Sequence, residues 1–182
     1  PLATGVMIIC TGKATKQIEK FQYQKKEYIA TLELGATTPS FDKELPIDAT
    51  YPTEHIDDEL LKEIIPQFTG ELWQIPPVYS AVKVKGKRAY EYAREGEKIK
   101  LKPKLLLIDE MEMLKFAPPY LTIRIVCSKG TYIRALARDI GLALKSGAHL
   151  AALERTGIGD VRLSDCMEIT EVLELIEKIN SQ

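Results

Sequence analysis

Hydrophobic and polar residues alternate from residue 25 to 35, which is the pattern of a strand with one buried face. The hydrophobic face holds every second residue from Tyr28 to Leu34. Two further hydrophobic segments, 105–116 and 120–127, are joined by Ala117-Pro118-Pro119 and therefore predict an antiparallel pair. Shorter strands are predicted at 78–85 and near 150–153.

Hydrophobic residues at helical spacing predict helices elsewhere in the chain. We expect Thr53 to cap a helix that Pro66 stops, because the acidic residues after Thr53 suit the positive end of a helix. Residues 131–145 predict a helix that packs one face on the sheet. Two more helices are predicted at 87–94 and 169–179. Together the elements predict an α/β (α+β) fold with a mixed, largely antiparallel sheet flanked by helices.

Composition and length are those of one compact, soluble domain. The chain has 182 residues, of which 45% are hydrophobic and 28% charged. It lacks both a hydrophobic run of membrane-spanning length and the pattern of a signal peptide, so we expect a cytoplasmic protein with no membrane partner and, by default, a monomer. Three separated cysteines and two histidines form no metal-binding motif. We therefore expect no metal and no cofactor.

Charge is unevenly distributed along the chain. The formal net charge of -1 is not the strongly basic charge typical of a nucleic-acid-binding protein. Lysine and arginine nevertheless gather between residues 83 and 104, whereas acidic residues concentrate at 57–63 and 168–177. This segregation predicts one basic face despite the nearly neutral net charge. The alternative is that these are ordinary solvated surface lysines.

Two short motifs suggest other functions. Gly5 to Gly12-Lys13-Ala14 resembles a phosphate-binding loop, but six residues separate the glycines instead of four, and alanine replaces the magnesium-binding hydroxyl residue. Pro76-Pro77-Val78-Tyr79 matches a ligand of WW domains, although an ordered bend is the alternative for that segment. A Gly-x-Ser-x-Gly motif is absent, so hydrolase chemistry is unsupported.

Separated segments together resemble the TruB family of tRNA pseudouridine synthases, in the same order along residues 1 to about 160. The resemblance begins at Pro1-Leu2-Ala3-Thr4-Gly5-Val6, which is similar to the second half of the family signature Gly-His-x-Gly-x-Leu-Asp-Pro-x-Ala-Thr-Gly-Val. The other matching segments are Gly12 to Lys16, Lys26-Glu27-Tyr28, Leu34 to Thr38 with Asp42, Gln74 to Lys83, Gly86 with Ala89 to Gly96, Cys127 to Arg134, Asp139 to Gly141, and Gly147 to Leu153.

The resemblance implies a function and a set of site residues. The function is isomerisation of the T-loop uridine of tRNA to pseudouridine, with the base flipped out of its stack and an aspartate nucleophile. Tyr28 would stack on the base and take part in proton transfer, and Tyr132 and Leu153 would contact the base. Arg134 would pair with the catalytic aspartate, which keeps that carboxylate ionised. Candidate contacts to the RNA backbone are Lys83, Lys85, Lys87, Arg88 and Lys129.

The sequence also departs from the family pattern at both ends. The nucleophilic aspartate would stand just before Pro1, so a protein limited to these residues is expected to bind a tRNA T-arm weakly and to be inactive. We expect the catalytic domain at 1–163 and an acidic helical tail at 164–182, without the RNA-binding PUA domain of many relatives. A noncatalytic RNA-binding or RNA-folding module is the main alternative, and a protein-interaction domain that uses Pro76 to Tyr79 is a weaker one.

Overall fold

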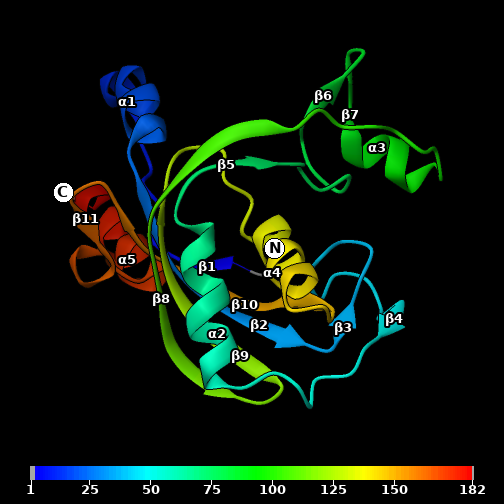
Figure 1. Cartoon of the computed structure of the whole chain (residues 1–182). Coiled ribbons are helices and arrows are strands. Elements are labelled where there is room, and N and C mark those ends of the chain that lie inside the picture. Colours follow the sequence, from blue (N-terminus) through cyan, green and yellow to red (C-terminus); the bar gives the residue numbers. More distant parts are fainter. Residues whose placement is uncertain (1–2, 182) are drawn as a thin grey trace.

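A central curved sheet organises the protein, whose computed structural model describes residues 3–181 (Figure 1). The strands lie in the order β1-β10-β2-β9-β8-β5, and β11 pairs with β10. All these pairs are antiparallel except β1 with β10, which is parallel. The predicted mixed, largely antiparallel sheet is therefore confirmed. The strands are β1 (Ala3–Gly5), β2 (Lys26–Leu34), β5 (Gly70–Gln74), β8 (Lys104–Ala117), β9 (Tyr120–Cys127), β10 (Ala148–Ile158) and β11 (Val161–Arg162).

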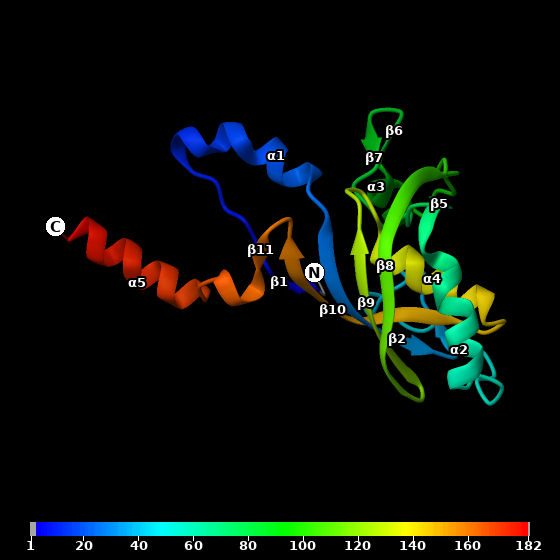
Figure 2. The same cartoon turned by 60° about the vertical axis from the view of Figure 1, so that its left-hand side comes forward.

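Two helices cover one face of this sheet and form the core with it. Helix α4 (Ile133–Ala143) packs on β10 and β2, and α2 (Asp58–Ile64), continued by the 3-10 helix η2 (Ile65–Phe68), packs beside β8 (Figure 2). On β2 the alternation predicted from the sequence is confirmed, because Ala30, Leu32 and Leu34 are buried. Complete burial of a leucine or isoleucine stabilises the fold by about 1.5–3 kcal/mol, so this layer dominates the stability.

Several predicted boundaries were wrong. Helix α2 is capped by Asp57, whose side chain accepts a hydrogen bond from the Leu60 amide at 2.9 Å, and not by Thr53. The strand predicted at 78–85 is reduced to β6 (Lys83–Val84), because residues 75–82 lie in loops. The short strand predicted near 150–153 is the middle of β10, which is much longer.

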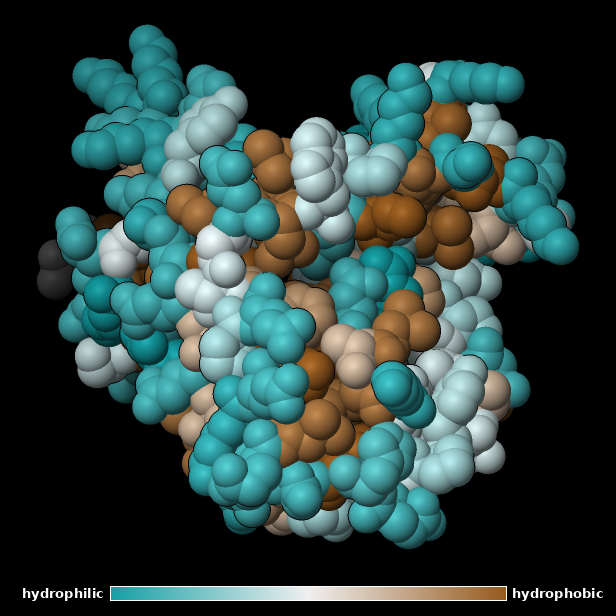
Figure 3. Space-filling model, viewed as in Figure 1, coloured by the Kyte–Doolittle hydropathy of each residue, from teal (hydrophilic) through white to brown (hydrophobic). Residues whose placement is uncertain are grey.

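An extension and two further helices lie outside the main sheet. Strands β6 and β7 (Lys87–Arg88) form a small hairpin that leads into α3 (Ala89–Arg94) and stands above the sheet in Figure 1. The segment η1 (Gly12–Gln17) with α1 (Ile18–Tyr23), and helix α5 (Ile169–Asn180), project away from the sheet in Figure 2. Hydrophilic side chains cover α1 and the outer end of the extension, whereas hydrophobic ones line the inner side of the extension (Figure 3). The remaining elements are β3 (Ala36–Thr37), which pairs with β4 (Ala49–Thr50), and the 3-10 helix η3 (Leu163–Asp165).

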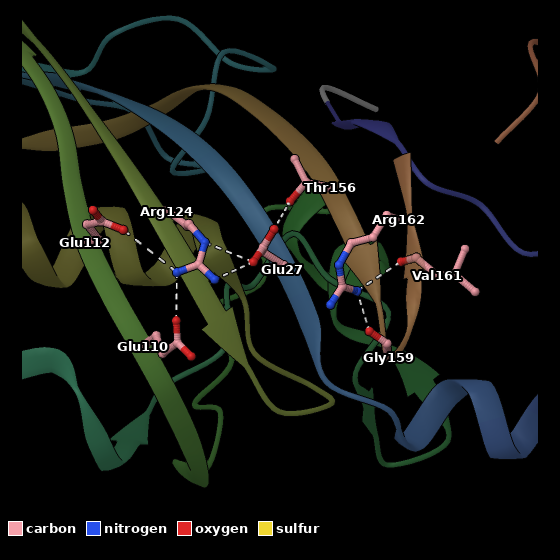
Figure 4. A network of polar contacts seen from close by, with 8 residues as sticks. All are labelled: Glu27, Glu110, Glu112, Arg124, Thr156, Gly159, Val161 and Arg162. Atoms are coloured by element: carbon pink, nitrogen blue, oxygen red, sulfur yellow. Dashed lines mark hydrogen bonds and ion pairs between the residues drawn. The ribbon is translucent and has the colours of Figure 1, made fainter. Parts of the chain in front are cut away.

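A polar network ties four strands together (Figure 4). Arg124 on β9 donates to Glu27 on β2 at 2.5 and 2.9 Å and to Glu110 on β8 at 2.7 Å. Thr156 on β10 donates to the second oxygen of Glu27 at 2.8 Å. The hydrogen bond from Thr156, together with those from Arg124, lowers the pKa of Glu27 against the opposing effect of burial. The network therefore fixes the order β10-β2-β9-β8 with an ionised glutamate at its centre.

Strand β1 lies close to β10 because it contains a glycine. Gly5 has a φ of +95°, and a Cβ atom placed on it would stand 2.2 Å from the carbonyl oxygen of Arg155. The next residue, Val6, continues the contact, since its amide donates to the Arg155 carbonyl at 2.8 Å and its carbonyl accepts from the Arg155 side chain at 2.7 Å. A side chain at position 5 would push β1 away from the sheet.

Candidate active site

A cavity of about 580 Å³ lies between the sheet and the start of α4. It is formed by side chains that are distant in the sequence, from β1, β2, the loop after β3, α4 and β10. Its lining residues are Ala3, Tyr28, Asp42, Lys43, Glu44, Thr131, Tyr132, Ile133, Arg134, Leu150 and Leu153. The structure therefore brings together Tyr28, Tyr132, Arg134 and Leu153, the four residues to which the sequence assigned catalysis and base contact.

Tyr28 enters the cavity from β2. The strand alternation directs it to the same face as Ala30 and Leu32, and on either side it faces Arg155 of β10 and Ile125 of β9. Burial raises the pKa of the Tyr28 hydroxyl, and the nearby Arg155 opposes this effect only in part. Tyr28 is therefore a protonated, half-buried aromatic ring at neutral pH, which suits it to stacking and to donating a hydrogen bond.

Tyr132 and Leu153 contribute the remaining aromatic and aliphatic surface. Tyr132 is the N-cap residue of α4, in an extended conformation that precedes the first helical turn. Leu153 lies on β10 between Ala30 of β2 and Ala3 of β1. Small alanine neighbours on both sides leave the Leu153 side chain accessible from the cavity, so this leucine is not simply part of the core.

Arg134 lies in the first turn of α4, where the helix dipole disfavours a positive charge. Three acceptors compensate for this position: the Asp42 carboxylate at 3.0 Å, the Tyr79 carbonyl at 2.9 Å and the Ser40 carbonyl at 3.3 Å. The side chain of Arg134 is 21% exposed and that of Asp42 only 8%. A largely buried ion pair thus holds the guanidinium at the cavity wall.

The role of Asp42 was missed in the sequence analysis, which quoted this residue only as part of a motif. Its loop is fixed by hydrogen bonds, because the Asp42 carbonyl accepts from Thr38 at 2.6 Å and its carboxylate accepts from the Glu44 amide at 3.0 Å. The loop also joins the sheet through a bridge between Asp42 and Leu150. An acidic residue in a loop with threonine and serine was the only signal in the sequence besides the motif.

The residues predicted to contact the RNA backbone do not share one cavity, unlike the four residues predicted for catalysis and base contact. Lys83 lines a second cavity, of about 680 Å³, which also borders Tyr132. Lys87 forms an ion pair with Glu95, and Arg88 donates to the Ala81 carbonyl at 2.7 Å. Lys85 has a φ of +50° and lies at the turn between β6 and β7, and the Lys129 ammonium lies 3.9 Å from the centre of the Tyr23 ring. Besides Lys83, the second cavity is lined by three lysines that were not among the predicted backbone contacts, namely Lys100, Lys102 and Lys104.

The structure also bears on the predicted WW-domain ligand, metal sites and membrane spans. Pro76 and Pro77 are buried and the Tyr79 carbonyl is bonded to Arg134, so this segment is an ordered bend and is not presented as a WW-domain ligand. Within residues 3–181, no group of three His, Cys, Asp or Glu side chains is arranged to hold a metal ion. In the same residues no helix has the length and apolar character needed to cross a membrane. The expected position of the nucleophile, next to Pro1, lies outside the described residues.

The fold and the cavity define the kind of site: aromatic and aliphatic side chains surround a space beside a guanidinium that an ion pair holds in place. Comparison with known proteins specifies the family. Residues 1–133 match the family "TruB family pseudouridylate synthase (N terminal domain)", and residues 134–182 match "tRNA pseudouridylate synthase B C-terminal domain". The chain therefore belongs to the TruB family of pseudouridine synthases.

Individual relatives agree with this assignment. The chain is 66% identical over 178 residues to "tRNA pseudouridine synthase B" of Phocaeicola vulgatus, a match that covers 98% of this chain and 76% of the relative. It is 62% identical over 178 residues to the protein of the same name from Bacteroides fragilis, with the same coverage. Among solved structures, one described as "Crystal Structure of a Cbf5-Nop10-Gar1 Complex" matches with a TM-score of 0.65 and 26% identity over 88% of this chain and 38% of that chain.

The two family matches do not correspond to two separate structural units. Their boundary, between residues 133 and 134, falls in the first turn of α4. Strand β10, in the second match, pairs with both β1 and β2 from the first. Tyr28 and Arg134 consequently come from different matches but line the same cavity.

Proposed function

We propose that this protein isomerises a uridine of tRNA to pseudouridine, and that its substrate is the uridine of the T-loop. The relatives named tRNA pseudouridine synthase B support the reaction. The single observation that supports the site is that Tyr28, Tyr132, Arg134 and Leu153, drawn from three distant parts of the chain, line one cavity.

The chemistry explains why such a cavity is needed. The glycosidic bond from N1 of uracil to the ribose breaks, the detached base rotates, and a carbon-carbon bond forms from C5, which loses its hydrogen as a proton. The base must leave its stack in the RNA and must be held while it is detached. Tyr28 provides the aromatic surface that replaces the lost stacking, and Leu153 and Tyr132 restrict the space into which the base could escape.

Arg134 is proposed to orient the nucleophile. A guanidinium beside a carboxylate favours its ionised form and fixes its direction, which a nucleophilic aspartate requires. Arg134 is held by Asp42 and by two carbonyl groups, so its position does not depend on the nucleophile. In this proposal the Arg134 guanidinium is already held at the cavity wall when the nucleophile takes its place.

The lysines beside the cavity are proposed to contact the RNA backbone. Lys83, Lys100, Lys102 and Lys104 surround the second cavity, which shares Tyr132 with the first. Phosphates bound there would lie next to the flipped base, because Tyr132 borders both spaces. Phosphate contacts of this kind supply affinity and position but little sequence preference.

The full-length gene product and a T-arm RNA that carries tritium at C5 of its uridines provide the test. Pseudouridine formation exchanges the C5 hydrogen with water, so the proposal expects tritium release at one uridine per RNA. Arg134→Ala should abolish release while the RNA still binds. Binding without any release by the wild-type protein would instead identify a noncatalytic RNA-binding module.

A further inference from the structure

Gln74, at the end of β5, forms two hydrogen bonds with the backbone of a single residue in the active site. Its side-chain oxygen accepts from the Tyr132 amide at 2.9 Å, and its side-chain nitrogen donates to the Tyr132 carbonyl at 3.2 Å. Gln74 is 58 residues away in the sequence and belongs to the edge strand of the sheet. The side chain therefore pairs with Tyr132 much as a neighbouring strand would.

Burial makes this contact unusual. Gln74 is only 1% exposed and is one of the few polar residues among the fully buried side chains. A primary amide is buried at a cost unless its donor and its acceptor are satisfied, and here both are satisfied by one peptide unit. A hydrophobic side chain of similar size would serve the packing better, so packing alone does not explain a glutamine at this position.

The backbone that Gln74 holds belongs to Tyr132, which lies between the first cavity and the second. Tyr132 borders both of the cavities described above, and Arg134, two residues later, lines the first. The Tyr132 side chain makes no capping hydrogen bond within the described residues 3–181, and the Tyr132 carbonyl accepts the first helical bond, from the Leu136 amide, at 3.0 Å. Gln74 is the only side chain among residues 3–181 whose hydrogen bonds fix both the amide and the carbonyl of this N-cap residue.

We propose that Gln74 is a positioning residue for catalysis, which sets Tyr132 against the base and fixes the start of the helix that carries Arg134. The inference rests on the proposed function and extends it to a residue that does not line the main cavity. Gln74 acts through the peptide of Tyr132, so its loss should lower turnover at the bound base more than it weakens RNA binding, which depends on the lysines around the second cavity.

The substitution Gln74→Glu tests this by making the two hydrogen bonds depend on pH. A neutral carboxylic acid can accept from the Tyr132 amide and donate to the Tyr132 carbonyl, as the glutamine does, whereas a carboxylate cannot donate. Burial raises the pKa of the introduced carboxyl, so its neutral form extends towards neutral pH. The kcat of the variant relative to wild type should therefore rise about tenfold between pH 8.5 and pH 6, with KM for the T-arm changed less than about threefold.

The control is Gln67→Glu in the full-length protein, at an exposed glutamine whose nitrogen donates to the Glu63 carbonyl. Its kcat ratio to wild type should not vary with pH. A flat ratio for Gln74→Glu, or a loss that falls on KM, would overturn the inference. Gln74→Leu, which fills the same space, should lower kcat at every pH, and unchanged kcat would also refute the positioning role. The wild-type protein distinguishes failure of this inference from failure of the proposed function. If the proposed function were wrong, the wild-type protein would form no pseudouridine at any pH.

Discussion

Replacing Asp42 by asparagine should reduce turnover by weakening the anchor of Arg134. The Asp42 carboxylate serves two donors, since one oxygen accepts from Arg134 at 3.0 Å and the other from the Glu44 amide at 3.0 Å. An asparagine side chain has one acceptor oxygen and one amino group. In either orientation of the amide, one donor would face another donor, and the negative charge opposite Arg134 would be lost.

The size of the effect follows from the geometry. A hydrogen bond to a charged group contributes about 1.5–3 kcal/mol. Arg134 keeps its bonds to the Tyr79 and Ser40 carbonyls and is 21% exposed, so part of the loss is compensated by these groups and by water. A net loss of about 2 kcal/mol corresponds to a decrease of about 30-fold. Because Arg134 is proposed to orient the nucleophile, this decrease should fall on kcat.

The rate of pseudouridine formation is measured in single-turnover experiments, with the enzyme in excess of the T-arm and above the Kd. Thermal unfolding reports whether the variant remains folded. Asp48→Asn is the matched control, because Asp48 lies in the same loop, is exposed and accepts from Thr37 at 2.7 Å without contacting the cavity. It should retain the wild-type rate. If a folded Asp42→Asn protein turned over within about threefold of wild type, the ion pair would not be what positions Arg134.

Three further predictions concern other parts of the molecule. Tyr28→Ala should lower turnover at least 100-fold, which raises the activation free energy by about 3 kcal/mol or more, but should weaken T-arm affinity less than about fivefold. One stacked base is lost while the phosphate contacts persist, so equal losses in both measurements would refute this role. T-arm affinity should fall steeply with salt, and Lys100→Ala with Lys102→Ala should make the log-log slope shallower by about 1–2, whereas an unchanged slope would exclude these lysines from phosphate contact. Gly5→Ala should lower the melting temperature more than Gly12→Ala, since both have positive φ but only Gly5 faces backbone atoms within 4 Å; equal shifts would contradict the steric argument.

Regular elements with a strong side-chain period were predictable from the sequence. On β2 the alternation from Tyr28 to Leu34 specifies which face is buried, and α4 carries its hydrophobic residues at helical spacing. The cap of α2 was not predictable in the same way, because Thr53 and Asp57 are both good N-cap residues and local sequence does not decide between them. Residues 78–82, the first part of the strand predicted at 78–85, lie in a loop, since contacts such as that from Arg134 to the Tyr79 carbonyl are made with a distant helix.

The site was predictable only as far as its residues belong to recognised motifs. The family resemblance indicated Tyr28, Tyr132, Arg134 and Leu153, which line the cavity. It did not indicate that Asp42 binds Arg134 or that Gln74 binds Tyr132, because those contacts span 92 and 58 residues of sequence and depend on tertiary structure. Whether the named residues have the proposed catalytic roles stays a prediction for the experiments above.

The pairing of β10 with both β1 and β2 has a consequence for how the protein is made. These strand pairs join Leu153 to Ala30 and to Ala3. The part of the cavity that these strands line is therefore built from segments synthesised far apart in time. Contacts of such long sequence separation form slowly, since a large loop must close before they stabilise the chain. On the ribosome, β2 and β9 can pair as soon as residue 127 has emerged, but the cavity cannot close until β10 follows. The cavity can therefore be completed only after β10 has been synthesised, and a chain interrupted before residue 148 would lack the part of the cavity that Leu150 and Leu153 line.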